Sequence, residues 1–212
     1  MVHPAARLVA ACRATAADPE LQVEFELSRE ARDEGELARL IRLFATYRRF
    51  PCPPPLQPGL LLPGRLVLAW RCGEVGGEID VVDVMAAMDR LVDVDLADTV
   101  VDGRRLGDLR VVDQVVREAG PYFTVVQIEG DVVVPQLLFT DLREVLPLEL
   151  DYGTYLEKAA LTRGILRWQE LFLNVDLKRD AIPVLRAGLA LLHERFPAPG
   201  LDDLEARLRA RS

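Results

Sequence analysis

The alternation of apolar and polar residues predicts a chain that mixes strands with helices. Residues 21–27 alternate strictly, which is the pattern of a strand with one buried face. Residues 5–16 instead carry apolar positions at helical spacing. Asp33 and Glu36 form a capping box for a second helix. The apolar stripe of that helix consists of Leu37, Leu40, Ile41, Phe44 and Tyr47.

The centre of the chain predicts shorter elements. Residues 50–58 hold five prolines and are expected to form a stiff linker, because each proline fixes φ and removes a donor. Residues 66–72 and 109–116 are apolar runs of strand length, with a short helix as the alternative for the second. The glycine-rich residues 73–78 favour a loop, and residues 80–91 favour a helix. The inward stripe of that helix would be Val81, Val84, Met85 and Met88.

A hairpin is predicted next. Residues 121–128 and 132–139 are rich in β-branched and aromatic side chains. Gly130 and Asp131 lie between them, and this pair supplies the positive φ that a tight turn needs. Pro135 cannot donate to a ladder, so its strand is expected to lie at a sheet edge or to carry a bulge.

The last third of the chain predicts helices. Asp151 is a natural N-cap, Trp168 begins a second helical stripe, and Asp180 caps a third helix. A final amphipathic helix follows two prolines that stop the third. The residues expected to face the core are Tyr152, Tyr155, Leu156, Ala159, Trp168, Leu171, Phe172, Val175, Leu185, Leu189, Leu192, Phe196, Leu201, Leu204 and Leu208.

The charge of the chain is uneven. The formal net charge is −8, and residues 78–151 hold 17 acidic and 6 basic side chains, a balance of −11. A partner with many phosphates would need Lys and Arg contacts, so this balance argues against nucleic-acid binding. It suits a basic protein partner, because complementary fields steer association. A solvated surface that keeps the protein soluble is the alternative interpretation.

Cysteine and histidine usage predicts neither a disulfide framework nor a metal or cofactor site. Cys12, Cys52 and Cys72 form no C-x-x-C pair, and His3 and His193 lie at opposite ends of the chain. These cysteines are typical of reduced thiols in a cytosolic protein. No apolar run approaches 18 residues, and the N-terminal stretch is too weak for a secretory signal, so no membrane contact is expected.

An acidic stretch resembles a calcium loop only at its start. Asp93, Asp95 and Asp98 are closely spaced, but Asp98 occupies the position that requires glycine. Arg104 stands where the bidentate glutamate belongs. Calcium binding is therefore not expected.

Known catalytic signatures are absent from the sequence. There is no G-x-S-x-G elbow, and serine occurs only at Ser28 and Ser212. No local signature supports a Cys–His pair, although sequence alone leaves one open. Paired carboxylates are abundant, which leaves a glycosidase-like dyad open by counting but is weak evidence in an acidic protein. We expect no enzymatic activity.

Residues 148–157, followed by residues 163–165 and Trp168-Gln169…Phe172, resemble the C-terminal part of SUKH superfamily proteins. This superfamily includes a yeast cell-wall-synthesis regulator and many bacterial immunity proteins for polymorphic toxins. Tyr155-Leu156-Glu157 is similar to their "Y-L-E" helix, and residues 123–139 match their central strands. The N-terminal half departs from the pattern. It lacks the Pro-containing helix and Asn-Gly-Gly loop, for which residues 73–77 are a degenerate counterpart.

The resemblance covers about a third of the chain and implies an α+β fold. A mostly antiparallel central sheet would carry packed helices, with residues 1–175 as the SUKH-like domain and residues 176–212 as a helical C-terminal extension packed on it. It also implies no catalysis and a protein-binding role. An immunity protein would occlude a toxin domain, often a basic nuclease, in the bacterial cytoplasm. The expected contact residues are Glu74, Glu78, Asp80 and Asp83.

A different class of function uses the C-terminal helices. The amphipathic residues 181–211 could dock the protein into a larger assembly as a structural or regulatory subunit.

Overall fold

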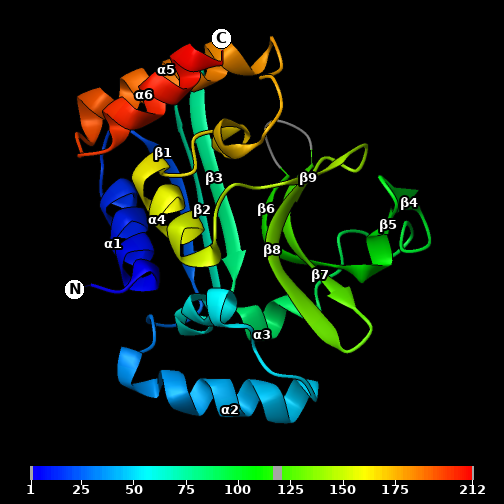
Figure 1. Cartoon of the computed structure of the whole chain (residues 1–212). Coiled ribbons are helices and arrows are strands. Elements are labelled where there is room, and N and C mark those ends of the chain that lie inside the picture. The colour runs from blue at the N-terminus through cyan, green and yellow to red at the C-terminus, as the bar shows by residue number, and fades with distance from the viewer. Residues whose placement is uncertain (1, 117–120, 212) are drawn as a thin grey trace.

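The computed structural model describes residues 2–116 and 121–211 and has an α+β fold (Figure 1). Seven strands form one antiparallel sheet in the order β1-β2-β3-β6-β7-β8-β9. Two further strands, β4 and β5, form a separate small hairpin. The strands are β1 (Gln22–Leu27), β2 (Arg65–Cys72), β3 (Val75–Val82), β4 (Val100–Val101), β5 (Arg104–Arg105), β6 (Leu109–Val115), β7 (Tyr122–Glu129), β8 (Val132–Thr140) and β9 (Val145–Pro147).

Helices α1 and α4 lie side by side on one face of β1, β2 and β3, while α5 and α6 close one end of the sheet and α2 the other (Figure 1). The helices are α1 (Pro4–Ala16), α2 (Leu37–Arg48), α3 (Val84–Ala87), α4 (Tyr152–Thr162), α5 (Ala181–Arg195) and α6 (Leu201–Ala210). Four short 3-10 segments are η1 (Glu34–Glu36), η2 (Pro54–Leu61), η3 (Leu106–Asp108) and η4 (Trp168–Phe172). In the described part of the chain, every helix is too short or too polar to cross a bilayer.

The sheet separates two hydrophobic cores. The larger core fills the space between the helices and the sheet, and an aromatic row runs through it. In that row the Trp168 ring lies 5.0 Å from the Tyr155 ring and 6.0 Å from the Phe172 ring, measured between centroids. The smaller core lies on the opposite face of β6, β7 and β8, under residues 92–108. It consists of Val92, Leu106, Leu109, Val111, Phe123, Val125, Leu138 and Val145.

The strongest periodic patterns are confirmed. The predicted helix at residues 5–16 is α1, and the alternating residues 21–27 form β1. The predicted hairpin is β7–β8, with Gly130 at a φ of 60° in its turn. Pro135 lies where the β7–β8 register shifts, as a bulge requires. Asp151 caps α4, because its Oδ1 accepts a hydrogen bond from the Thr154 amide at 2.7 Å.

The helix predicted for residues 80–91 is wrong in its first part. Strand β3 runs through Val82, and only Val84–Ala87 is helical. Asp83 marks the change, since its Oδ1 accepts the Ala86 amide at 2.7 Å and so caps α3. The loop predicted for residues 73–78 is likewise limited to Gly73 and Glu74, which connect β2 to β3.

The proline-rich stretch is not the spacer that residues 50–58 predict. Residues 54–61 form the 3-10 segment η2, whose geometry suits the fixed φ of proline. Leu56, Leu60 and Leu61 are fully buried in the larger core. The apolar residues interleaved with the prolines therefore make this stretch part of the core.

Smaller corrections concern helix boundaries and faces. The helix predicted from Trp168 to Val175 is limited to the single turn η4, and Val175 is exposed. Tyr47 is exposed on α2 instead of facing the core. Asp33 caps the short segment η1, and Glu36 pairs with Arg39 instead of completing a capping box.

The C-terminal helices bury their apolar faces against the rest of the chain. Leucines of α5 and α6 belong to the same hydrophobic cluster as residues of α1 and α4. Residues 176–211 thus pack on the same body, and the boundary at residue 175 stays an interpretation of the sequence. The buried leucines are Leu185, Leu189, Leu192, Leu201, Leu204 and Leu208.

Replacement of Gly59 tests how closely η2 packs against Tyr152 of α4. A Cβ at Gly59 would lie 2.0 Å from Cε1 of buried Tyr152, so Gly59→Ala is expected to lower the free energy of unfolding by about 1–3 kcal/mol. Gly153→Ala is the matched control. Its Cβ would lie 3.5 Å from Asp151 Oδ1, which is an ordinary contact distance, and alanine favours the helix, so stability should hold or rise. Urea unfolding of both variants measures this, and equal stabilities would contradict the packing described for η2.

Candidate functional site

Backbone pairing is sparse where the two halves of the sheet meet. Strands β3 and β6 share a single registered pair, Val81 with Asp113, whereas β2 and β3 are paired along their whole length. Side chains supply the missing connections. Asp113 Oδ1 accepts the Asp80 amide at 2.9 Å, and Glu78 Oε1 accepts the Val116 amide at 3.3 Å. We call this β3–β6 junction the seam.

Asp80 accepts several hydrogen bonds at the seam. Its buried carboxylate accepts hydrogen bonds from Arg65 at 2.9 and 3.0 Å, from Arg90 at 2.8 Å and from Gln114 at 2.6 Å. Burial opposes ionisation, but the hydrogen bonds and charges of Arg65 and Arg90 outweigh it and lower the pKa of Asp80 below its ordinary value. The carboxylate is therefore charged at neutral pH and neutralised inside the protein.

A second buried network lies on the helical side of the seam. The Tyr155 hydroxyl of α4 donates to Asp113 Oδ2 and lies 3.0 Å from Thr124 Oγ1. Gln169 Nε2 of η4 donates to the Tyr155 hydroxyl oxygen at 3.4 Å. Burial raises the pKa of Asp113 to about 7, against the opposing effect of the hydrogen bonds from Tyr155 and the Asp80 amide. This network connects α4, η4, β6 and β7.

Asp83 has its own arginine pair at the end of β3. Besides capping α3, its carboxylate lies 2.9 Å from the Arg32 guanidinium and 3.5 Å from that of Arg29. Arg32 also donates to the carbonyl of Leu60 in η2. Asp83 thereby connects the N-terminal segment, η2 and α3.

The structure separates the four predicted contact residues. Glu78, Asp80 and Asp83 are buried and bonded within the protein, and only Glu74, at the β2–β3 turn, is exposed. Among these four, Glu74 alone can meet a partner without a rearrangement of the sheet. The role of the four as contact residues stays a prediction.

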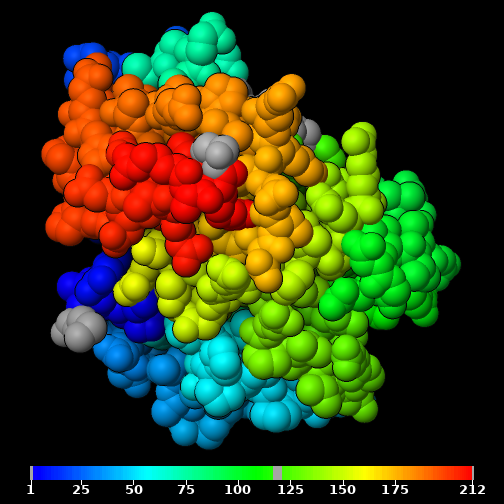
Figure 2. All heavy atoms as spheres, turned by 45° about the horizontal axis from the view of Figure 1, so that its top comes forward, coloured from blue at the N-terminus to red at the C-terminus, as the bar shows by residue number. Residues whose placement is uncertain are grey.

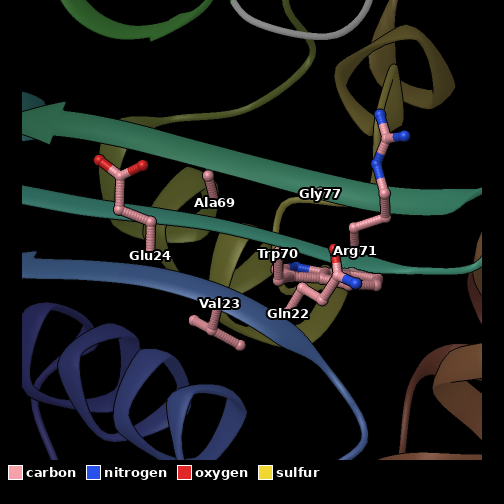
Figure 3. A pocket seen from close by; sticks show the side chains of 7 residues that line it. All are labelled: Gln22, Val23, Glu24, Ala69, Trp70, Arg71 and Gly77. Atoms are coloured by element: carbon pink, nitrogen blue, oxygen red, sulfur yellow. The ribbon is translucent and has the colours of Figure 1, made fainter.

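The face of β1–β3 that points away from α1 and α4 carries a shallow open depression of about 300 Å³. Figure 3 shows Glu24 of β1 and Arg71 of β2 pointing to the same side of the sheet, while Val23 points to the other side, toward α1. Trp70 lies in the sheet beside Gly77, and its Nε1 donates to the Arg163 carbonyl at 2.7 Å. The lining mixes Gln22, Glu24 and Arg71 with apolar residues, and the depression is too open to exclude water.

Residues 92–108 form an acidic arm over the smaller core. Its tip is the β4–β5 hairpin, where Asp102 and Gly103 have φ values of 49° and 77°, as a type I′ turn requires. Arg105 pairs with Asp98 at 2.7 Å. Figure 2 shows this green region projecting from one side of the molecule. The acidic residues of the arm are Asp93, Asp95, Asp98, Asp102 and Asp108.

The acidic arm is held against the sheet by one buried leucine and by two polar contacts. Leu106 is fully buried in the smaller core. Asp102 Oδ2 accepts the Val145 amide of β9 at 2.8 Å, and Arg104 Nε donates to Gln127 Oε1 of β7 at 3.1 Å. Two apolar side chains nonetheless face solvent, since Val94 is 75% and Val100 is 60% exposed.

The arm hairpin was missed at the level of sequence, although a signal for it exists. Asp102-Gly103 is the Asp-Gly pair that favours a two-residue turn, and it lies between Val100-Val101 and Arg104-Arg105. The closely spaced carboxylates of residues 92–98 are the more conspicuous pattern, and they obscure this turn.

The nucleophilic side chains do not assemble with a base among the described residues. Burial raises the pKa of the Cys12 and Cys52 thiols to about 12, so both are protonated at neutral pH. The Ser28 hydroxyl donates to the Pro63 carbonyl. His193 lies 3.2 Å from Glu205 on α6. In residues 2–116 and 121–211, no cluster of three or more His, Cys, Asp or Glu side chains could hold a metal ion.

Comparison with protein-family models, with curated proteins and with solved structures finds no match for this chain.

Asp80→Ala tests the structural role of the seam. Its removal leaves Arg90 and Gln114 without their buried acceptor, whereas half-exposed Arg65 can turn to water, so we expect a loss of about 2–3 kcal/mol in the free energy of unfolding. Glu74→Ala, an exposed control, should change stability by less than about 0.5 kcal/mol. Urea unfolding at neutral pH compares them. A loss for Asp80→Ala no larger than for Glu74→Ala would refute the seam's role.

The raised pKa of Asp113 predicts a specific pH dependence. Between its unfolded pKa of about 4 and its folded pKa of about 7, the folded state binds more protons than the unfolded state. The contribution of Asp113 is therefore complete below pH 4 and lost as pH rises through 7. The stability of the wild type relative to Asp113→Asn should fall across this window. Urea unfolding from pH 4 to 8 measures it, and a constant difference would contradict the assignment.

Proposed function

We propose that the protein is a non-catalytic protein-binding module, an immunity protein that binds and occludes a basic toxin domain in the bacterial cytoplasm. The observation that carries the proposal is the acidic arm, an ordered projection that presents carboxylates and solvent-facing valines together. The resemblance of residues 123–139 and 148–172 to the SUKH superfamily supports the class of function.

The composition of the arm fits a basic protein partner. It holds five acidic residues against Arg104 and Arg105, and Arg104 is already bonded to Gln127. Carboxylates on a projecting surface attract a basic site, and the same site on a nuclease attracts phosphate. Val94 and Val100 supply apolar area that a partner would bury. Acidic side chains placed over such a site would exclude its substrate.

The anchoring of the arm also favours binding. The contacts of Asp102 with β9 and of Arg104 with β7 hold the arm in one conformation before a partner arrives. A preorganised surface loses less conformational entropy on association than a mobile loop. The arm therefore resembles a recognition surface more than a solubilising tail.

The assembly-subunit alternative has less support. It requires the apolar faces of α5 and α6 for docking, and the leucines of those faces are buried against the protein itself. The surface that remains exposed on these helices mixes charged residues with Pro183, Val184 and alanines.

Capture of partners from the native host tests the proposal. We expect the wild type to retain a basic protein at low salt and to lose it at high salt, because the attraction is screened. Asp95→Lys, on the arm, should abolish retention, since it reverses an exposed charge at the surface.

Asp203→Lys on α6 makes the same change in net charge and should retain the partner. Quantitative mass spectrometry of the retained proteins provides the measurement. If Asp95→Lys retains the partner as well as the wild type does, or if high salt does not release the partner, the proposed role of the arm is contradicted.

A further inference from the structure

The sheet ends in an edge strand whose outer side is unpaired. Strand β1 pairs only with β2, and it is the first strand in the sheet order. Within the described residues, no hydrogen bond occupies the outer backbone groups of Val23, Phe25 or Leu27. Figure 3 shows β1 as the lowest of the three strands in the view, next to α1.

The register identifies which backbone groups point outward. Ser28 donates its amide to the Arg65 carbonyl at 3.1 Å, and these residues continue the β1–β2 register by one step. Hydrogen-bonded and non-hydrogen-bonded pairs alternate in an antiparallel ladder. Glu26, Glu24 and Gln22 therefore bond to β2. Val23, Phe25 and Leu27 direct one N–H and one C=O each to the open edge.

The side chains along this edge form two different rows. Val23, Phe25 and Leu27 lie on the helical side and are only half-buried, although they pack against the larger core. Alternation places Gln22, Glu24 and Glu26 on the opposite side of the sheet, where all three are exposed. An added strand would complete the burial of the first row and lie beside the carboxylates of the second.

The charge of the second row selects the occupant. A second copy of the chain would place Glu24 and Glu26 beside their own counterparts, and like charges on adjacent strands are destabilising. A strand whose arginines or lysines alternate with apolar residues would meet the carboxylates with one face and the half-buried row with the other. The carboxylates at this edge therefore oppose pairing with a second copy of the chain and favour pairing with a basic strand.

We propose that the outer edge of β1 is a docking site for an extended basic segment of a partner protein, which adds to the sheet as an eighth strand. The segment hydrogen-bonds to the backbone of Val23, Phe25 and Leu27. This site is separate from the acidic arm, so it depends on a different set of variants and does not require the proposed function.

The test uses a blocked ten-residue peptide of alternating arginine and valine as the probe. Amide exchange measured by NMR provides an internal control. In the free protein the amides of Val23, Phe25 and Leu27 should exchange faster than those of Glu24 and Glu26, and addition of the peptide should slow them specifically. A peptide with proline in place of valine has the same charge but lacks half of the N–H donors, so it should cause no such slowing.

Two protein variants separate strand addition from general attraction. Val23→Pro removes an outward N–H and leaves the β2 ladder intact, so it should weaken peptide binding at least about tenfold by fluorescence anisotropy. Glu26→Lys, which keeps every backbone donor, should also weaken binding at low salt, whereas Asp203→Lys should not.

Several outcomes would overturn the proposal. They are the absence of peptide binding, equal binding by the proline-substituted peptide, equal binding by Glu26→Lys and Asp203→Lys, or slowed exchange at amides other than those of β1. Dimerisation of the protein through β1 in sedimentation would also contradict the assigned occupant.

Discussion

The fold depends on the seam between β3 and β6, where buried side chains replace a backbone ladder. One registered pair joins these strands, and Asp80, Asp113 and Glu78 provide the other connections across it. Buried charge is tolerated there because Arg65 and Arg90 neutralise Asp80. The fold is therefore sensitive to substitutions at the seam, because a buried carboxylate that lost its arginine partners would destabilise the folded state. The sheet curves at this junction, with helices on one side and the smaller core on the other (Figure 1).

This use of charge changes how the acidic composition is interpreted. Residues 78–151 have a charge balance of −11, yet several of their carboxylates are buried and bonded within the protein. The carboxylates available to a partner lie mainly on the acidic arm and at turns. The net charge of a segment therefore overstates how many carboxylates can attract a partner. Only the exposed carboxylates contribute to that attraction.

The sequence predicted elements well where one physical signal dominated. Strict alternation identified β1, and the Gly130-Asp131 turn identified the β7–β8 hairpin. Strand β3 was missed because Glu78 and Asp80 are polar residues in an almost fully buried strand, and the partners of Asp80, namely Arg65, Arg90 and Gln114, lie up to 34 residues away in sequence. The burial of η2 was missed for a similar reason, because proline count indicates stiffness but not what the interleaved leucines contact. The seam could not be predicted, since it exists only after distant strands meet.

The seam holds the two halves of the sheet together, and we propose that the acidic arm meets the partner. Hydrogen-exchange mass spectrometry of the protein, alone and with a basic protein captured from its host, tests both roles most directly. We expect new protection in residues 92–108 and unchanged exchange in residues 78–83, which are already buried. New protection confined to residues 74–83, with none on the arm, would contradict it.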